Sequence, residues 1–264
     1  MSIIDAIIIA IVEGITEFLP ISSTGHMIIT EKILGIPPSD FSKLFTVGIQ
    51  LGAILAVVVL YWKKFIAPIQ NNQWSFYIKL LIAVIPALVL GYIFSDKIDA
   101  LLESTTTVAI SLIAGGVVLL FIDAVFKNQI KDTDEKITKP NAFVIGLWQC
   151  IAMIPGVSRS AASIIGGMQQ KLTRKLAAEF SFFLAVPTMA AATGFKLLQG
   201  YKTITTEHIQ LFVIGNVVAF VVALLAIRFF IRFLQNHGFR VFGYYRIIVG
   251  LVLLLLIANG YLAK

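Results

Sequence analysis

The chain is poor in charge and in cysteine. Only 13% of its 264 residues are Asp, Glu, Lys or Arg, whereas 58% are hydrophobic. A soluble domain carries roughly 25% charged residues, so this composition excludes an ordinary soluble fold. The lone Cys150 excludes an internal disulfide framework and most thiolate metal sites. The first apolar run, from Ile3, lacks the basic flank and small-residue cleavage site of a signal peptide, so we expect no cleaved leader.

What the chain has instead is long apolar segments. Six of them have about the length that crosses a bilayer. Two more, at 3–36 and 142–169, are interrupted by Pro, Gly and hydroxyl residues. We therefore predict an all-α polytopic membrane protein of about ten helices in a single membrane domain, 1–264. The six predicted spans are 44–61, 76–94, 107–126, 180–198, 209–227 and 241–258.

The net charge of +7 comes from cations that are unevenly placed. If the six spans alternate in direction, fourteen Lys and Arg residues fall on one side and six on the other, with Arg159 in neither group. The positive-inside bias assigns the larger group, which includes Lys63, Lys127 and Arg246, to the cytoplasm. The excess of cations is thus explained by membrane topology, and no nucleic-acid partner is expected.

The segment 142–169 has cytoplasmic flanks at both ends. It is therefore predicted to enter the membrane and return as a helical hairpin, with its turn at Pro155-Gly156. Irregular backbone at membrane depth persists only where protein or water shields it. The turn is expected to be buried in the bundle.

An internal repeat relates this segment to the first one. With an offset of 136 residues, Glu13 aligns with Gln149, Ser22 with Ser158 and Thr24 with Ser160. Each half then holds one hairpin and three spans, and an odd number of spans forces the halves into opposite orientations. We predict an inverted repeat with its site at the midplane, where the broken helices meet. Repeat one is 1–126, a cytoplasmic linker is 127–140 and repeat two is 141–264, with both termini outside.

The first hairpin carries two carboxylates at membrane depth. Glu13 and Glu17 are four residues apart and share one face of a helix. Each ionised group in such a place costs about 2.5–3.5 kcal/mol on insertion scales, which favours a functional role. Magnesium suits the pair, because it takes one or two carboxylates together with substrate phosphates. The alternative is a structural pair hydrogen-bonded to neighbouring helices.

Hydroxyl groups and an imidazole follow. Pro20 ends the first half-helix, and Ser22, Ser23 and Thr24 begin the next, where hydroxyls and free N–H groups form an anion site. Read alone, these residues are as consistent with helix capping. His26 can act as nucleophile, general base or general acid, or it can serve as a hydrogen-bonding residue between helices.

The second hairpin supplies a cation. Arg159 lies between Ser158 and Ser160 at the predicted helix break, and its planar fork suits a phosphate bidentately. In the empty protein Arg159 could instead pair with Glu13 or Glu17. Together these residue types are suited to phosphoryl transfer or hydrolysis. Because the site lies inside a membrane bundle, the expected substrate is a phosphorylated lipid.

Two motifs resemble a known family. The run from Glu13 to His26, EGITEFLPISSTGH, and the run from Pro155 to Ser160, PGVSRS, are similar to the signature motifs of bacterial undecaprenyl-diphosphate phosphatases, also called bacitracin-resistance proteins. The resemblance covers essentially the whole chain, including 49–53 and 180–182. One departure is Ala161, where many members are expected to have glycine.

The resemblance implies hydrolysis of undecaprenyl diphosphate to undecaprenyl phosphate and inorganic phosphate. This reaction recycles the lipid carrier of cell-wall and peptidoglycan synthesis at the outer face of the cell membrane and confers bacitracin resistance. It implies Mg²⁺ or Ca²⁺ as cofactor, catalytic roles for His26, Glu17, Glu13, Ser23 and Arg159, and metal binding by Glu13 and Glu17. The implied phosphate contacts are Arg159, Ser22, Ser23, Thr24, Ser158 and Ser160.

Three points stay open at this level. The nucleophile is His26, Ser23 or a water molecule. The oligomeric state is undetermined, with a homodimer as one option. The rival function is a polyprenyl-phosphate flippase or an anion transporter that uses the same inverted-repeat site. Paired carboxylates beside a histidine favour hydrolysis, because anion carriage gains little from two negative charges.

Overall fold

The computed structural model describes residues 1–102 and 104–261, and the regular structure of this part is helical apart from an isolated bridge between Lys131 and Leu172. Six helical stretches are long and apolar enough to cross a membrane, as predicted. They are Asp40–Leu60, Ser75–Ile93, Thr105–Val125, Arg174–Thr203, Thr206–Asn236 and Arg240–Ala258. The chain is a multi-pass membrane protein.

The spans correspond to named helices. The first is divided into α3 (Asp40–Gly48) and α4 (Gln50–Leu60), and the fourth runs as α11 (Arg174–Gly200) into the short η3 (Tyr201–Thr203). The others are α6 (Ser75–Ile93), α8 (Thr105–Val125), α12 (Thr206–Asn236) and α13 (Arg240–Ala258). Two short helices, α5 (Trp62–Gln70) and α7 (Ser95–Leu102), were not predicted.

Both interrupted segments form helical hairpins, as predicted. The first consists of α1 (Ile3–Thr16) and α2 (Ser23–Ile33), and the second of α9 (Lys139–Cys150), the short η2 (Ile151–Met153) and α10 (Arg159–Gln169). Because α9 begins at Lys139, the helix starts inside the predicted linker 127–140. The linker also contains the short η1 (Asp134–Lys136).

Capping residues in the sequence mark where the helices begin. Ser2 and Thr138 each form a capping box, with Asp5 and Asn141 respectively, and so satisfy N–H groups that the first helical turn leaves free. Pro140 sits in the first turn of α9, where its missing N–H costs nothing. Local signals of this kind fix where each hairpin arm begins.

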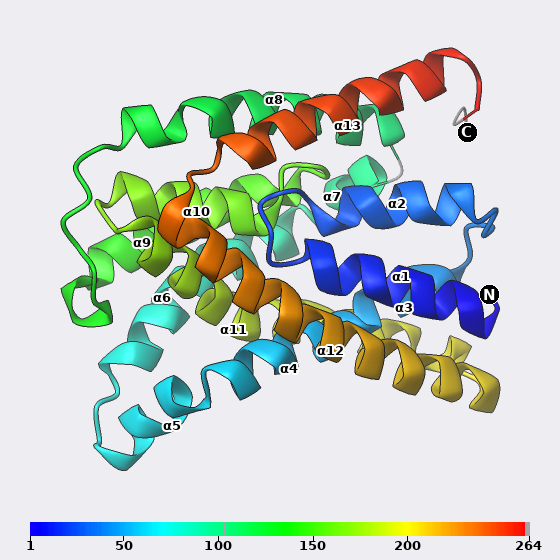
Figure 1. Ribbon diagram of the computed structural model, residues 1–264. Helices are drawn as coiled ribbons and strands as arrows, with labels where there is room; N and C mark the ends of the chain where they lie inside the picture. Colours follow the sequence, from blue (N-terminus) through cyan, green and yellow to red (C-terminus); the bar gives the residue numbers. More distant parts are fainter. Residues whose placement is uncertain (103, 262–264) are drawn as a thin grey trace.

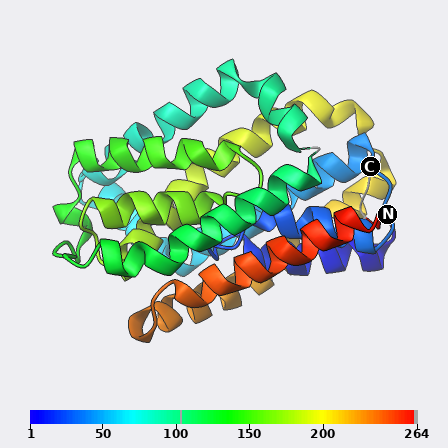
Figure 2. The ribbon, with the colours of Figure 1, turned by 90° about the horizontal axis from the view of Figure 1, so that it is seen from above.

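The two hairpins enter the bundle from opposite ends, and their tips meet near its middle (Figure 1). Helix α1 packs against α12, the second span of the other half, and α9 packs against α6, the second span of the first half. The third spans, α8 and α13, lie side by side along the bundle (Figure 2). This exchange of partners between halves is the arrangement expected of the predicted inverted repeat.

Glycine allows the hairpin arms to approach the spans closely. A Cβ at Gly146 of α9 would lie 2.2 Å from the Ala83 carbonyl oxygen of α6, and one at Gly14 of α1 would lie 2.9 Å from the Ala219 oxygen of α12. Along the middle of α12 the inner face carries Gly215, Ala219 and Ala223, whereas the larger Val217 and Val221 between them face outward. Small residues inside and large ones outside are typical of helices packed in lipid.

Several loops predicted to share the cytoplasm do meet at one end of the bundle. Lys64, after α4, pairs with Asp134 of the linker, and Lys131 of the linker bridges to Leu172, between α10 and α11. The first and last helices, α1 and α13, begin and end respectively at the opposite end (Figure 1). Which end faces the cytoplasm remains a prediction.

Candidate active site

The site forms where the two hairpin tips touch. The Ser160 hydroxyl, on the second hairpin, donates a hydrogen bond to the Leu19 carbonyl of the first at 2.7 Å. A cavity of about 170 Å³ lies beside this contact and takes its walls from both tips and from α4 and α11. Its lining residues are Glu17, Ser22, Ser23, Thr24, Gln50, Ala152, Met153, Pro155, Gly156, Ser158, Arg159 and Met189.

The two tips share an unusual backbone conformation. Ser22 and Ser158, which are 136 positions apart, have φ of 73° and 76°, a region that residues with a side chain seldom adopt. Each is the N-cap of the following helix, where its hydroxyl accepts from Gly25 N and Ala161 N respectively. Such conformations cost about 1–3 kcal/mol and persist where surrounding contacts impose them. Both tips thereby direct a helix N-terminus at the cavity, which favours an anion.

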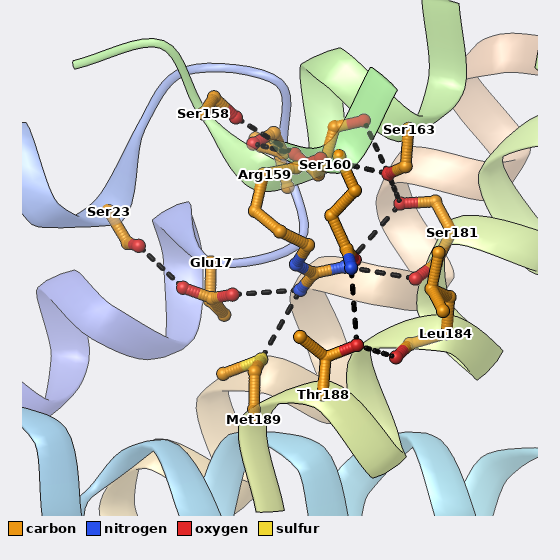
Figure 3. A network of polar contacts seen from close by, with 12 residues as sticks. Glu17, Ser23, Ser158, Arg159, Ser160, Ser163, Ser181, Leu184, Thr188 and Met189 are labelled. Atoms are coloured by element: carbon orange, nitrogen blue, oxygen red, sulfur yellow. Dashed lines mark hydrogen bonds and ion pairs between the residues drawn. The ribbon is translucent and has the colours of Figure 1, made fainter. Parts of the chain in front are cut away.

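Glu17 joins the two hairpins at the cavity. Its Oε2 accepts from the Ser23 hydroxyl at 2.5 Å, and its Oε1 accepts from Arg159 Nη2 at 2.8 Å (Figure 3). The pairing of Arg159 with one of the two glutamates is therefore confirmed, and the partner is Glu17. A serine hydroxyl bonded to a carboxylate is the arrangement that prepares a nucleophile.

Arg159 is held from the other side by α11. Its Nη1 donates to the Ser181 carbonyl at 2.9 Å, Nη2 contacts the Met189 sulfur at 3.4 Å, and the guanidinium lies 5.8 Å from the Phe18 ring (Figure 3). Its Nε is buried without a hydrogen-bond partner among the described residues. The fork is fixed in place at the cavity and keeps one donor uncommitted.

Glu13 lies outside the cavity wall, one helical turn before Glu17. It is 0% exposed, and both of its carboxylate oxygens lack a hydrogen-bond partner among the described residues. The carboxylate interacts electrostatically with Glu17 and with Arg159. Its counterpart in the repeat, Gln149, is also buried and leaves its Oε1 without a partner there. An unpaired buried carboxylate is costly, so this position is suited to receive a cation.

His26 does not line the cavity. Its Nδ1 lies 2.7 Å from the Ser22 carbonyl oxygen and its Nε2 lies 2.7 Å from the Tyr245 hydroxyl, while the two rings stack at 5.6 Å. A carbonyl only accepts, so Nδ1 carries the proton and donates to Ser22. The imidazole thus stabilises the strained backbone of Ser22 through this hydrogen bond. The predicted catalytic role of His26 stays a prediction.

The remaining predicted residues divide into two groups. Ser22, Thr24 and Ser158 line the cavity. Ser160 is fully buried and bonded to Leu19, so it holds the tips together. Gln50 lines the cavity from α4, although the sequence singled it out only as part of the run 49–53.

One cation was misassigned. Arg246 was counted among the cytoplasmic cations, yet it is 0% exposed and its guanidinium bonds to both hairpin tips. A flank count treats every cation near the end of an apolar run as solvated, which is wrong here. The signal that could have found it is an arginine seven residues into a membrane helix, because ionisable residues at depth mark function.

Comparisons with known proteins identify the family of the chain. Residues 6–252 match the family described as "Bacitracin resistance protein BacA". A protein of Flavobacterium psychrophilum named undecaprenyl-diphosphatase is 61% identical over 259 residues, covering 97% of this chain and 96% of its own. Proteins of the same name from Porphyromonas gingivalis and Aquifex aeolicus are 52% and 44% identical, covering 98% and 94% of this chain and 98% and 95% of their own. The chain belongs to the bacitracin resistance protein BacA family.

Proposed function

We propose that this protein hydrolyses undecaprenyl diphosphate to undecaprenyl phosphate and inorganic phosphate, and so returns the lipid carrier to cell-wall synthesis and confers bacitracin resistance. The observation that carries the proposal is the Ser23–Glu17–Arg159 chain at a cavity between two helix N-termini. In this chain of contacts the hydroxyl is the nucleophile, the carboxylate is the base and the guanidinium binds the anion. The identity of the lipid substrate is inferred from the name of the relatives, undecaprenyl-diphosphatase.

The geometry supports Ser23 as the nucleophile. Its hydroxyl lines the cavity and already donates to Glu17, whereas both nitrogens of His26 are engaged away from the cavity. Ser23 Oγ attacks the terminal phosphorus and passes its proton to Glu17, and the bond to the bridging oxygen breaks. Glu17 gives that proton to the departing lipid phosphate. Water then attacks the phosphoserine, with Glu17 taking its proton and returning it to Ser23 as inorganic phosphate leaves.

Arg159 supplies the main positive charge for the substrate. Its side chain is 14% exposed and its guanidinium is paired with Glu17, so a phosphate replaces part of that pairing when it binds. Ser22, Thr24 and Ser158 add hydroxyl groups around the same cavity. Because α2 and α10 both begin here, their free N–H groups face the developing charge.

Glu13 and Glu17 would hold a Mg²⁺ or Ca²⁺ ion. The fit rests on Glu13, whose buried carboxylate has no hydrogen-bond partner among the described residues. The described residues contain no cluster of three His, Cys, Asp or Glu, so such an ion would need further ligands from substrate phosphate and water, as Mg²⁺ commonly does. When bound, it offsets the charge of the diphosphate.

Phosphate release from purified protein tests the proposal. In detergent, with undecaprenyl diphosphate and Mg²⁺, the wild type should release phosphate, and EDTA should abolish release until Mg²⁺ or Ca²⁺ is restored. Arg159→Ala should lower kcat/KM by about 100-fold or more, whereas Arg228→Ala, on the exposed face of α12, should not. Lipid movement across vesicles without phosphate release would instead indicate a flippase and would refute the proposal.

A further inference from the structure

Arg246 joins three parts of the molecule through one guanidinium. It is fully buried on α13. Its Nη1 donates to the Pro20 carbonyl of the first tip at 3.1 Å and to the Val157 carbonyl of the second at 2.9 Å. Its Nη2 donates to Gly156 at 2.8 Å and to Ser111 of α8 at 3.1 Å, and its Nε donates to Leu112 at 3.3 Å.

Every N–H group of the guanidinium is used, and each acceptor is a backbone carbonyl. The tip carbonyls belong to broken helices at membrane depth, where an unsatisfied carbonyl costs several kcal/mol. Arg246 satisfies three tip carbonyls and two carbonyls of α8 at once, which takes all five donors of its planar fork. Among the described residues, no carboxylate forms an ion pair with its positive charge.

The anchored carbonyls are next to the reacting groups. Pro20 lies three residues before Ser23, and Val157 lies two before Arg159. Gly156 itself lines the cavity. Since Ser23 and Arg159 come from different hairpins, their separation depends on what holds the two tips together. Arg246 is placed to set that separation.

The neighbouring helix leaves room for this side chain. A Cβ on Gly115 of α8 would lie 2.2 Å from Arg246 Nη2, and a Cβ on Gly116 would lie 3.1 Å from Arg246 Cβ. The guanidinium therefore occupies the space that a side chain at position 115 would otherwise fill. The glycine gives a second route to disturb the fork without changing the arginine.

We propose that Arg246 is a positioning residue, which locks the two hairpin tips in register so that the hydroxyl of Ser23 and the guanidinium of Arg159 face the same phosphate. The kinetic test of this inference rests on the proposed hydrolysis. Its structural test measures the packing of the tips and does not depend on that function. It assigns to α13 a role in the site although α13 contributes no residue to the cavity wall.

The first test keeps the charge and changes the fork. Arg246→Lys retains a cation but cannot reach both tips, so kcat should fall by about 100-fold, as expected for a misplacement of about 1 Å, with KM for the lipid within about threefold of wild type. Arg240→Lys, an exposed position on the same helix, should leave both constants unchanged. A monodisperse Arg246→Lys protein with wild-type kcat would overturn the inference.

The second test displaces the fork from outside. Gly115→Ala should lower kcat at least about tenfold, because the added methyl group meets Nη2, although alanine favours the helix more than glycine does. Gly194→Ala on α11, where a Cβ meets nothing within 4 Å, is the matched control and should be neutral. Unchanged kcat in Gly115→Ala with an unchanged melting temperature would contradict the inference, and this variant decides the matter if Arg246→Lys does not fold.

A readout without catalysis separates this inference from the proposed function. Cys150 is the lone cysteine and lies half-buried at the end of α9, five residues before Pro155. Loosening of the second tip should raise the rate at which maleimide labels Cys150 by at least about fivefold in Arg246→Lys and Gly115→Ala. The controls Arg240→Lys and Gly194→Ala should label at the wild-type rate. Unchanged labelling overturns the positioning role even if the enzyme assay works. Faster labelling supports it even if wild-type protein releases no phosphate, the result that would refute the hydrolysis instead.

Discussion

The two oxygens of the Glu17 carboxylate have different partners, Ser23 on one and Arg159 on the other. The oxygen that accepts from the Ser23 hydroxyl is placed to take its proton, while the other oxygen is held by the guanidinium. A single glutamate therefore connects the group that attacks with the group that binds phosphate. Its own hairpin supplies the serine, and the opposite hairpin supplies the arginine.

Removing the Ser23 hydroxyl removes the nucleophile. Ser23→Ala should lower kcat by at least about 1,000-fold because no other hydroxyl bonds to Glu17 among the described residues. Acid-quenched wild-type protein should carry phosphate on Ser23 by mass spectrometry. The control is Ser75→Ala, at the exposed start of α6. Near-normal turnover by Ser23→Ala would show that His26 or water attacks phosphorus.

The support that His26 gives to Ser22 depends on Tyr245. Tyr245→Phe removes the hydroxyl that contacts Nε2 but keeps the stacked ring, so a loss of about 1 kcal/mol, or roughly fivefold in kcat, is expected. Steady-state kinetics against Tyr244→Phe, its exposed neighbour, provide the measurement and the control. Equal rates in the two variants would show that the hydroxyl has no bearing on the site.

At the scale of helices, the hairpin arms depend on close backbone contact with a span of the other half. Gly146 of α9 meets the Ala83 carbonyl of α6, and Gly14 of α1 meets α12 in the same way. In a membrane such contacts replace the hydrophobic effect as the force that packs helices. The position of each tip therefore follows from small residues on the hairpin arms, which do not themselves line the cavity.

Gly146→Ala should separate α9 from α6. A methyl group 2.2 Å from a backbone oxygen forces the helices apart, with an expected cost of about 1–3 kcal/mol and a lower melting temperature in detergent. Gly194→Ala, in open space on α11, should melt at or slightly above the wild-type temperature. A Gly146→Ala protein as stable as this control would mean that the arm can shift without loss.

At the scale of the whole molecule, the bundle has two ends with different loops. One end gathers the loops around Lys64, Asp134 and Leu172, and the other holds the start of α1 and the end of α13. The positive-inside bias predicts that the first end lies in the cytoplasm and that the first hairpin enters from outside. We infer that substrate reaches the cavity from that outer face.

Cysteine labelling tests the orientation. In a Cys150→Ala background, Pro38→Cys should react with a membrane-impermeant maleimide added to intact cells, and Gln73→Cys should react only after lysis. Both positions are exposed loop residues, Pro38 between α2 and α3 and Gln73 between α5 and α6. The opposite pattern would place the first hairpin and the termini in the cytoplasm.

The sequence alone determined the class of protein, six spans, two broken helices and the candidate residues at their breaks. These features are local: an apolar run of bilayer length, a proline followed by hydroxyls, and a cap residue each act within a few positions. The offset of 136 residues was also visible, and it reappears as matching strained serines at positions 22 and 158. The boundaries of the two repeats and the linker stay predictions.

Only the tertiary structure decided which of these residues face one another. It paired Arg159 with Glu17 and left Glu13 without a hydrogen-bond partner among the described residues. It also turned His26 toward Tyr245 and placed Arg246 inside the bundle instead of among the cytoplasmic charges. The physical reason is that a buried polar group must find partners wherever the packing supplies them. For Arg246 those partners are five backbone carbonyls, and a backbone carbonyl leaves no trace in the sequence.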